Sequence, residues 1–231
     1  MKAILFDIDD TLYNQIQPFE NAYRDVFGQQ QSSWIEALFK QSRKRSDEVF
    51  EASRRGEITM EEMYIYRVQK ALADFDIQVT DKQALDFQER YVYYGKCIAL
   101  TETMKKILDF CRKYAKLGII TNGPAARQWG KTQTLGLLNW VKRENIFVSG
   151  DLGVAKPDQR IFEYAARQMG LDDDRIYVGD SYANDVIGAV HAGWDAVWFN
   201  RRNREIPAGQ RVPAYCIHTE QELYDIIREL I

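Results

Sequence analysis

Four short clusters of polar residues contain the side chains that are best suited to chemistry. In chain order they are Asp7-Ile8-Asp9-Asp10-Thr11, Thr121-Asn122, Gly153-Val154-Ala155-Lys156-Pro157, and Gly179-Asp180-Ser181 with Asn184-Asp185 close behind. Carboxylates, a hydroxyl and a lysine are the groups that transfer of a phosphoryl group requires, because that reaction depends on positioning and on neutralising charge. Any one of these clusters alone is common in proteins, so the inference depends on their order and on their converging at one place.

Two of the carboxylates are suited to binding a metal ion. A phosphate ester is dianionic, so a carboxylate can attack it only when a cation screens the repulsion. Asp7 and Asp180 supply the hard oxygen ligands that Mg²⁺ prefers. One oxygen of Asp7 would hold the metal while the other attacks phosphorus. Lys156 is expected to neutralise charge, to keep Asp7 ionised by proximity and to hold a phosphate oxygen.

The remaining polar groups are expected to bind the phosphate and to transfer protons. The Thr121 hydroxyl and the adjacent amide of Asn122 are candidate donors to the phosphate oxygens. Asp9 is placed to protonate the leaving alkoxide and then to take a proton from the hydrolytic water. A free aspartate has a pKa of about 3.9, so this role requires burial or neighbouring carboxylates to raise the pKa of Asp9.

Apolar runs place these clusters at the ends of strands. The expected strands are Ala3 to Phe6, Leu117 to Ile120, Asn145 to Val148, Arg175 to Val178 and Ala196 to Phe199, with an edge strand at Tyr215 to Ile217. Helical patterns lie between them, and strands that alternate with helices predict an α/β fold with a doubly wound parallel sheet. In such sheets ligands bind beyond the carboxyl ends of the strands, which is where the four clusters fall.

The segment 15–96 has a different character. It is rich in charged and aromatic residues, and its apolar positions recur at helical spacing. Thr59 and Glu62 match the capping box that begins a helix. We therefore predict an α/β core made of 1–14 and 97–231, interrupted by a helical bundle over 15–96.

Composition excludes several classes of partner. The formal net charge of -3 and the pI near 5.6 argue against a nucleic-acid polymer, which needs a basic face. The three cysteines match neither a disulfide framework nor a zinc pattern. No run approaches the roughly 20 apolar residues of a membrane helix, and Asp7 interrupts the first apolar run too early for a secretory signal. We expect a cytoplasmic protein with a small-molecule partner.

Taken in order, the clusters resemble the four motifs of the haloacid dehalogenase (HAD) superfamily. Asp7, Asp9 and Thr11 match Asp-x-Asp-x-Thr, Thr121 and Lys156 match the second and third motifs, and Asp180 with Asp185 matches the acidic fourth motif. The resemblance implies a Rossmann-like core in which Asp7, the Asp9 backbone carbonyl and Asp180 bind Mg²⁺, while Asp185 acts through metal-bound water. It also identifies the helical segment with the C1 cap, which closes over the site and selects the substrate.

Core segments are similar to the pyrimidine 5'-nucleotidase branch of this superfamily. These segments are Gly118-Ile119-Ile120-Thr121-Asn122-Gly123, Gly153-Val154-Ala155-Lys156-Pro157, and Trp198-Phe199-Asn200 ahead of Arg202 and Pro207. Haloacid dehalogenases lack the second acid of the first motif, so Asp9 argues against them. Phosphonatases use a Schiff-base lysine in the cap, a role that is not assignable to Lys40, Lys44 or Lys70.

The resemblance thus implies a phosphatase that acts through an aspartyl-phosphate on a small soluble phosphate ester, with pyrimidine nucleoside 5'-monophosphates as candidate substrates. Two alternatives remain open. Sugar-phosphate phosphatases and β-phosphoglucomutase-like phosphotransferases share all four motifs and the cap type. A non-catalytic protein that binds a phosphorylated ligand has the same fold, but it would normally have lost Asp7, Asp9, Lys156 or Asp180, and none is lost here.

Overall fold

The computed structural model describes residues 1–206, 209, 213 and 215–231. Pro207, one of the residues in the nucleotidase-like segments, lies outside the described residues. The chain divides into two compact units. Met1–Asn14 with Ala99–Ile231 forms an α/β unit, and Gln15–Ile98 forms a helical unit.

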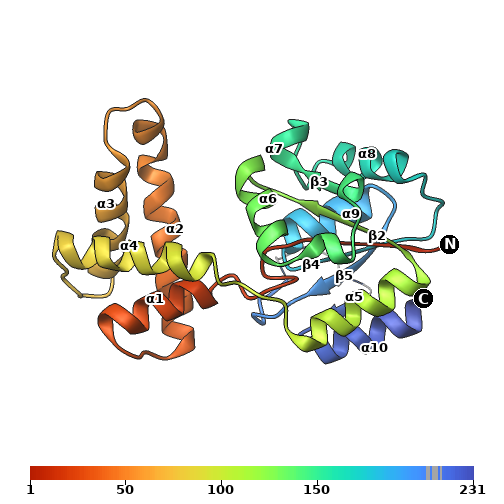
Figure 1. Cartoon of the computed structure of the whole chain (residues 1–231), viewed down its shortest axis with the longest axis horizontal. Helices are drawn as coiled ribbons and strands as arrows, with labels where there is room; N and C mark the ends of the chain where they lie inside the picture. Colours follow the sequence, from red (N-terminus) through yellow and green to blue (C-terminus); the bar gives the residue numbers. More distant parts are fainter. Residues whose placement is uncertain (207–208, 210–212, 214) are drawn as a thin grey trace. The chain divides into compact units, whose positions relative to one another are not determined.

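The described part of the α/β unit contains a six-stranded parallel sheet (Figure 1). Its strands are β1 (Ala3–Phe6), β2 (Lys116–Thr121), β3 (Ile146–Val148), β4 (Arg175–Gly179), β5 (Asp195–Phe199) and β6 (Tyr215–Ile217). Their order across the sheet is β3-β2-β1-β4-β5-β6, which is a doubly wound topology with β1 near the centre. The predicted fold class is confirmed.

Helices cover both faces of this sheet. They are α5 (Glu102–Tyr114), α6 (Ala125–Thr134), α7 (Ser149–Leu152), α8 (Gln159–Met169), α9 (Ile187–His191) and α10 (Glu220–Leu230), with short 3₁₀ turns at Leu137–Asn139 and Arg143–Asn145 and a π-type turn at Tyr182–Val186. Figure 1 shows α5 and α10 side by side on one face and α8 and α9 on the other.

The core of the α/β unit follows from the two-residue alternation of side chains along each strand. All four residues of β1 are buried, as expected for a strand covered on both faces. One cluster joins the sheet to α8 and α9, and it includes Leu5, Tyr177, Trp198, Phe162 and Ala189. Burying a large apolar side chain of this kind stabilises the fold by about 1.5–3 kcal/mol.

Strand register brings the expected site residues to one edge. Phe6 pairs with Ile119 of β2 and with Val178 of β4. The residues that follow these strands therefore leave the sheet at the same level, since parallel strands share one carboxyl edge. Asp7 and Asp180 directly follow β1 and β4 at this edge, and Thr121 is the last residue of β2.

The helical unit is built from two pairs of packed helices. Its helices are α1 (Gln17–Phe27), α2 (Ser32–Arg54), α3 (Met60–Ala73) and α4 (Asp81–Gly95). α1 packs mainly against α4, and α2 mainly against α3. The predicted capping box of Thr59 and Glu62 begins α3, and Thr80 with Gln83 forms a second one at the start of α4.

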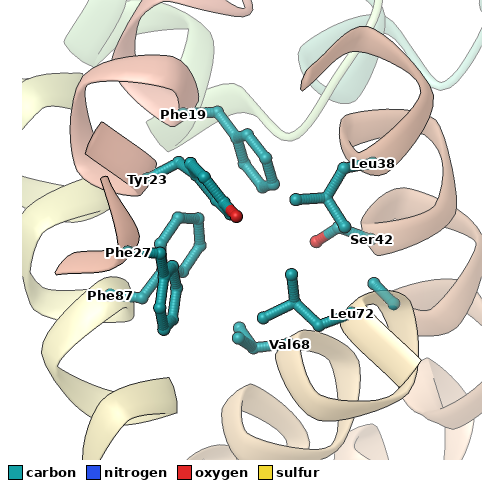
Figure 2. Close-up of a pocket in the computed structure, with 9 residues that line it drawn as sticks. Phe19, Tyr23, Phe27, Leu38, Ser42, Val68, Leu72 and Phe87 are labelled. Atoms are coloured by element: carbon teal, nitrogen blue, oxygen red, sulfur yellow. The ribbon is translucent and has the colours of Figure 1, made fainter. Parts of the chain in front are cut away.

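Aromatic rings fill the core of the helical unit. Phe19 contacts Phe39 and Phe87 edge to face, with ring centroids 5.3 and 4.9 Å apart. Figure 2 shows Phe19 of α1 and Phe87 of α4 facing Leu38 and Leu72 across a small void. The void measures about 10 Å³, at the lower limit of the roughly 10–15 Å³ that one water molecule needs. It is a packing gap and is too small for a ligand.

Along the described part of the chain, no helix combines the length and the apolar character that crossing a membrane would require.

Candidate active site

The end of β1 places Asp7 in a network centred on the buried ammonium of Lys156. That ammonium donates hydrogen bonds to Asp7 Oδ1 at 2.8 Å, Asp185 Oδ1 at 2.6 Å and Tyr177 Oη at 2.7 Å. Lys156 is 4% exposed, and a buried cation persists only when it is paired. Burial opposes its charge, but Asp185 and Asp7 raise the pKa of Lys156 well above its usual value. The lysine therefore stays charged and holds both carboxylates.

Asp7 itself is not fully ionised by this arrangement near neutral pH. Burial raises the pKa of Asp7 to about 7, against the lowering effect of Lys156, and the charges of Asp185 and Asp9 add to the rise. Lys156 acts in the expected direction and lowers the pKa of Asp7, but burial and the two neighbouring carboxylates outweigh it.

The loop after β4 brings in two more carboxylates. Asp185 Oδ2 accepts the Ser181 N–H at 2.8 Å. The approach is so close that a Cβ on Gly179 would lie 2.4 Å from Asp185 Cγ, so only glycine fits there. Asp180 Oδ2 accepts from Arg204 Nη1 at 3.0 Å. Burial, assisted by the nearby acids, nevertheless raises the pKa of Asp180 to about 8.

These carboxylates form a group that fits a divalent cation. Asp7, Asp180 and Asp185 each offer one oxygen, and the three oxygens lie within 4.8 Å of one another. Burial, assisted by the neighbouring carboxylates, raises the pKa values of Asp7 and Asp180, and a cation bound between their oxygens would favour the ionised forms. Hard oxygen ligands crowded in this way suit Mg²⁺, which keeps several of its own waters. Asp185 was expected to act through such a water, and its oxygens are already bonded to Lys156 and to the Ser181 amide.

The Asp9 carboxylate has surroundings that the sequence analysis did not anticipate. Lys131 Nζ lies 2.6 and 2.5 Å from its two oxygens, Gln128 Nε2 donates at 3.2 Å, and the Tyr13 hydroxyl donates at 2.6 Å. Although burial acts to raise the pKa of Asp9, Lys131 and the other donors bring it below the usual value. The shift is opposite in direction to the one that the acid and base role requires, because the Lys131 ammonium lies directly against this carboxylate.

Thr121 and Asn122 differ in how they are used. Thr121 is buried at the end of β2, and its Oγ1 has no hydrogen-bond partner among the described residues. The Asn122 side chain exchanges two hydrogen bonds of 2.9 Å with the backbone of Lys156. It therefore fixes the loop that carries the lysine, which leaves the Asn122 main chain as its candidate contact with phosphate.

Most of these side chains face one cavity of about 160 Å³. It is lined by Asp7, Asp9, Asn122, Lys156, Asp180, Ser181, Asn184 and Asp185. Five of these residues were predicted as metal, catalytic or phosphate contacts, and Asp185 was predicted as an outer ligand. Thr121 is not part of this lining. Ser181 and Asn184 line the cavity without having been assigned a role.

Arginines at the end of β5 hold the loop after β1 in place. Arg202 binds Asp10 through two hydrogen bonds of 3.0 and 2.6 Å and also donates to Asn14. Arg201 donates to the carbonyls of Asp10 and Thr11 at 3.3 Å. Asp10 is buried and has a positive φ of 57°, so the ion pair steadies a sparsely populated backbone conformation next to Asp9.

Comparison with known proteins places this geometry in a family. A family model for haloacid dehalogenase-like hydrolases matches residues 1–193. Glyceraldehyde 3-phosphate phosphatase of Methanopyrus kandleri is 27% identical, with 100% of this chain and 98% of that protein covered. Pyrimidine 5'-nucleotidase YjjG of Escherichia coli is 35% identical over 123 residues, which is 52% of this chain and 53% of that protein.

A solved structure shares the fold. The magnesium-bound HAD-hydrolase YfnB of Bacillus subtilis superposes with a TM-score of 0.67 at 23% identity, covering 98% of each chain. Since the family model covers most of the chain, this protein belongs to the haloacid dehalogenase-like hydrolases.

Proposed function

We propose that the protein is a Mg²⁺-dependent phosphomonoester hydrolase that forms an aspartyl-phosphate on Asp7. One observation carries the proposal. Asp7 lines a cavity of about 160 Å³ together with Lys156 and the carboxylates of Asp180 and Asp185. A buried nucleophile, a fixed cation and a set of metal ligands are the groups that in-line attack on a phosphate ester needs.

Asp7, Asp180 and the Asp9 carbonyl would hold the metal, and Asp185 would contact it through a metal-bound water molecule. When bound there, Mg²⁺ supplies the positive charge that reduces repulsion between the carboxylate and the phosphate. Lys156 also neutralises charge at the nucleophile, since its ammonium lies 2.8 Å from Asp7 Oδ1. The buried Thr121 hydroxyl and the Asn122 amide are the proposed donors to the remaining phosphate oxygens.

The reaction has two halves that share one proton carrier. In the first, an Asp7 oxygen bonds to phosphorus, the bond from phosphorus to the leaving oxygen breaks, and Asp9 gives its proton to that oxygen. In the second, water attacks phosphorus, Asp9 takes the proton from that water, and the bond to Asp7 breaks to release inorganic phosphate. An ionised Asp9 suits the second half. For the first half, the approaching phosphate dianion raises the pKa of Asp9 and favours its protonated form.

We propose a small phosphorylated metabolite as the substrate. The relatives support two classes, since one is a glyceraldehyde 3-phosphate phosphatase and another a pyrimidine 5'-nucleotidase. The whole-chain match favours short sugar phosphates, and the half-chain match favours nucleoside 5'-monophosphates. We propose that the helical unit, Gln15–Ile98, acts as the C1 cap that selects between them.

Metal removal tests the proposal. We expect the protein to release inorganic phosphate from members of a panel of sugar phosphates, nucleoside 5'-monophosphates and other phosphometabolites when Mg²⁺ is present. EDTA should abolish the release and Mg²⁺ should restore it. Ca²⁺ should fail, because its larger and looser coordination shell lets both Asp7 oxygens bind the metal and so removes the nucleophile. Full activity of metal-free protein in EDTA would contradict the proposal.

The same carboxylates predict a pH-dependent affinity for Mg²⁺. Burial raises the pKa of Asp7 to about 7 and that of Asp180 to about 8. Both groups are protonated below these values and must lose their protons before they bind a cation. Affinity is therefore expected to rise between about pH 6 and pH 8, with release of roughly one proton per ion at neutral pH. Isothermal titration calorimetry in two buffers of different ionisation enthalpy measures this release. An affinity that stays constant with pH and releases no protons would argue against the assigned ligands.

A further inference from the structure

We propose that Lys131 and Gln128 are positioning residues that hold the Asp9 carboxylate at a fixed place beside the phosphate site. This inference rests on the proposed phosphatase function, and it concerns residues for which the four motifs give no role. Neither residue is proposed to touch the phosphate or the metal. Instead, they fix the position of the Asp9 carboxylate, which must protonate the leaving oxygen as it departs.

The two residues reach Asp9 from a separate element. They lie one helical turn apart on α6, which begins at Ala125, and only Gly123 and Pro124 separate that helix from Thr121-Asn122. Tyr13 also donates to Asp9, but it lies only four residues away in the same loop. Lys131 and Gln128 are 122 and 119 residues away in the sequence. They therefore tie Asp9 to the segment that carries the proposed phosphate donors.

The contacts leave the carboxylate little freedom. Lys131 Nζ lies 2.6 Å from Oδ1 and 2.5 Å from Oδ2 of Asp9, so the ammonium lies across both oxygens. Gln128 Nε2 reaches Oδ2 at 3.2 Å and the Asn122 carbonyl at 2.8 Å. One amide nitrogen thus connects Asp9 directly to Asn122, the residue that follows β2. The lysine and aspartate side chains are 11% and 21% exposed, so water competes only weakly for these bonds.

Gln128 makes this contact at a cost to stability. It is 2% exposed, and its Oε1 has no hydrogen-bond partner within the part of the chain that the structure describes. A buried amide oxygen without a partner is unfavourable and calls for an explanation. The nearby Gly123 has a φ of 144°, and a Cβ there would lie 2.6 Å from Gln128 Nε2. The chain therefore accepts an unpaired oxygen and a constrained glycine in order to aim this nitrogen at Asp9 and Asn122.

Positioning should matter most when the leaving oxygen needs a proton. Departure of an alkoxide depends on general-acid help from Asp9, whereas p-nitrophenolate leaves without it. For a reaction that passes through a covalent intermediate, kcat/KM reports the steps up to departure of the leaving group. The ratio of kcat/KM for an alkyl phosphate to that for p-nitrophenyl phosphate therefore isolates the contribution of a well-placed Asp9.

The experiment measures this ratio in Lys131→Met, Gln128→Met and Lys131→Arg, at saturating Mg²⁺. The alkyl phosphate is either glyceraldehyde 3-phosphate or uridine 5'-monophosphate. The one that the wild-type protein turns over faster is used for all variants. Lys131→Met should lower the ratio by about 10- to 100-fold, the range expected for a misplaced catalytic group, and Gln128→Met should lower it less. Lys131→Arg should restore most of it, because a charged donor is retained. Lys142→Met is the matched control, since Lys142 is exposed, and should leave the ratio unchanged.

The outcomes separate the possible failures. Equal losses on both substrates, or no loss, in a folded Lys131→Met protein would overturn the positioning role while leaving the phosphatase proposal intact. If Lys131→Met does not fold, Gln128→Met decides in its place. An unchanged ratio in that variant overturns the role, and a lowered ratio supports it. A wild-type protein that releases phosphate from no member of the phosphometabolite panel and none from p-nitrophenyl phosphate would overturn the proposed function itself.

Discussion

Asp7→Asn is expected to abolish formation of a phosphoenzyme and to lower turnover by roughly 10⁴-fold or more, as removal of a covalent nucleophile usually does. The substituted amide is neutral and cannot attack phosphorus. It has nearly the same shape, so the cavity around Lys156 and Asp180 should persist. The loss should therefore appear in chemistry and not in folding, which a thermal unfolding curve can verify.

Rapid quench with p-nitrophenyl phosphate provides the measurement. Wild-type protein should give an acid-stable, hydroxylamine-sensitive phosphoenzyme, and Asp7→Asn should give none. Asp9→Asn is the matched variant two residues away. Its first half-reaction should survive with this leaving group, because nitrophenolate needs no proton, while hydrolysis of the intermediate slows by about 10²–10⁴-fold. A burst that survives in Asp7→Asn would show that Asp7 is not the nucleophile.

Lys156→Met is expected to lower the free energy of unfolding of the α/β unit by about 3–5 kcal/mol, the usual cost of removing one partner from a buried ion pair. Lys156 bonds to both Asp7 and Asp185, at 2.8 and 2.6 Å. Without it two buried carboxylates remain with no ammonium between them. Mg²⁺ should recover part of the loss, because binding to the folded state alone stabilises that state.

Urea unfolding followed by tryptophan fluorescence measures this effect in the relevant unit. Four of the five tryptophans lie in the α/β unit, and only Trp34 lies in the helical unit. In a Trp34→Phe background, the tryptophan fluorescence therefore reports on the α/β unit alone. Lys142→Met in that background should change stability by no more than about 0.5 kcal/mol, since Lys142 is exposed. The double variant Lys156→Met with Asp185→Asn should lose less than the sum of the single losses. Additive losses would mean that the buried ion pair does not account for the destabilisation.

Local features of the chain were predictable from sequence because they depend on near neighbours. The strand Ala3–Phe6 begins and ends where predicted, since a run of four apolar residues between Lys2 and Asp7 suits a strand buried on both faces. The capping box at Thr59 needs only a residue three positions away. A second capping box, at Thr80 and Gln83, has the same spacing and could have been predicted in the same way.

Part of the candidate site was also predictable, because the topology of a parallel sheet shows which residues lie near one another even when no distances are known. Once strands and helices alternate, the residue after each strand emerges at the same edge. Asp7 and Asp180, which directly follow β1 and β4, could therefore be assigned to one edge, and both line one cavity together with Lys156. The motif pattern also identified the family, which the match over residues 1–193 confirms.

The electrostatic state of that cavity was decided only by the tertiary structure. Whether the pKa of Asp9 rises or falls depends on which charge faces it, and that charge is Lys131, 122 residues away on α6. Helical spacing shows that Gln128 and Lys131 share a helix face, but not that this face is directed at Asp9. Asp7 illustrates the same limit. Its pKa is the balance of burial against Lys156 and two other carboxylates, and these opposing effects can be compared only when all the neighbours are in place.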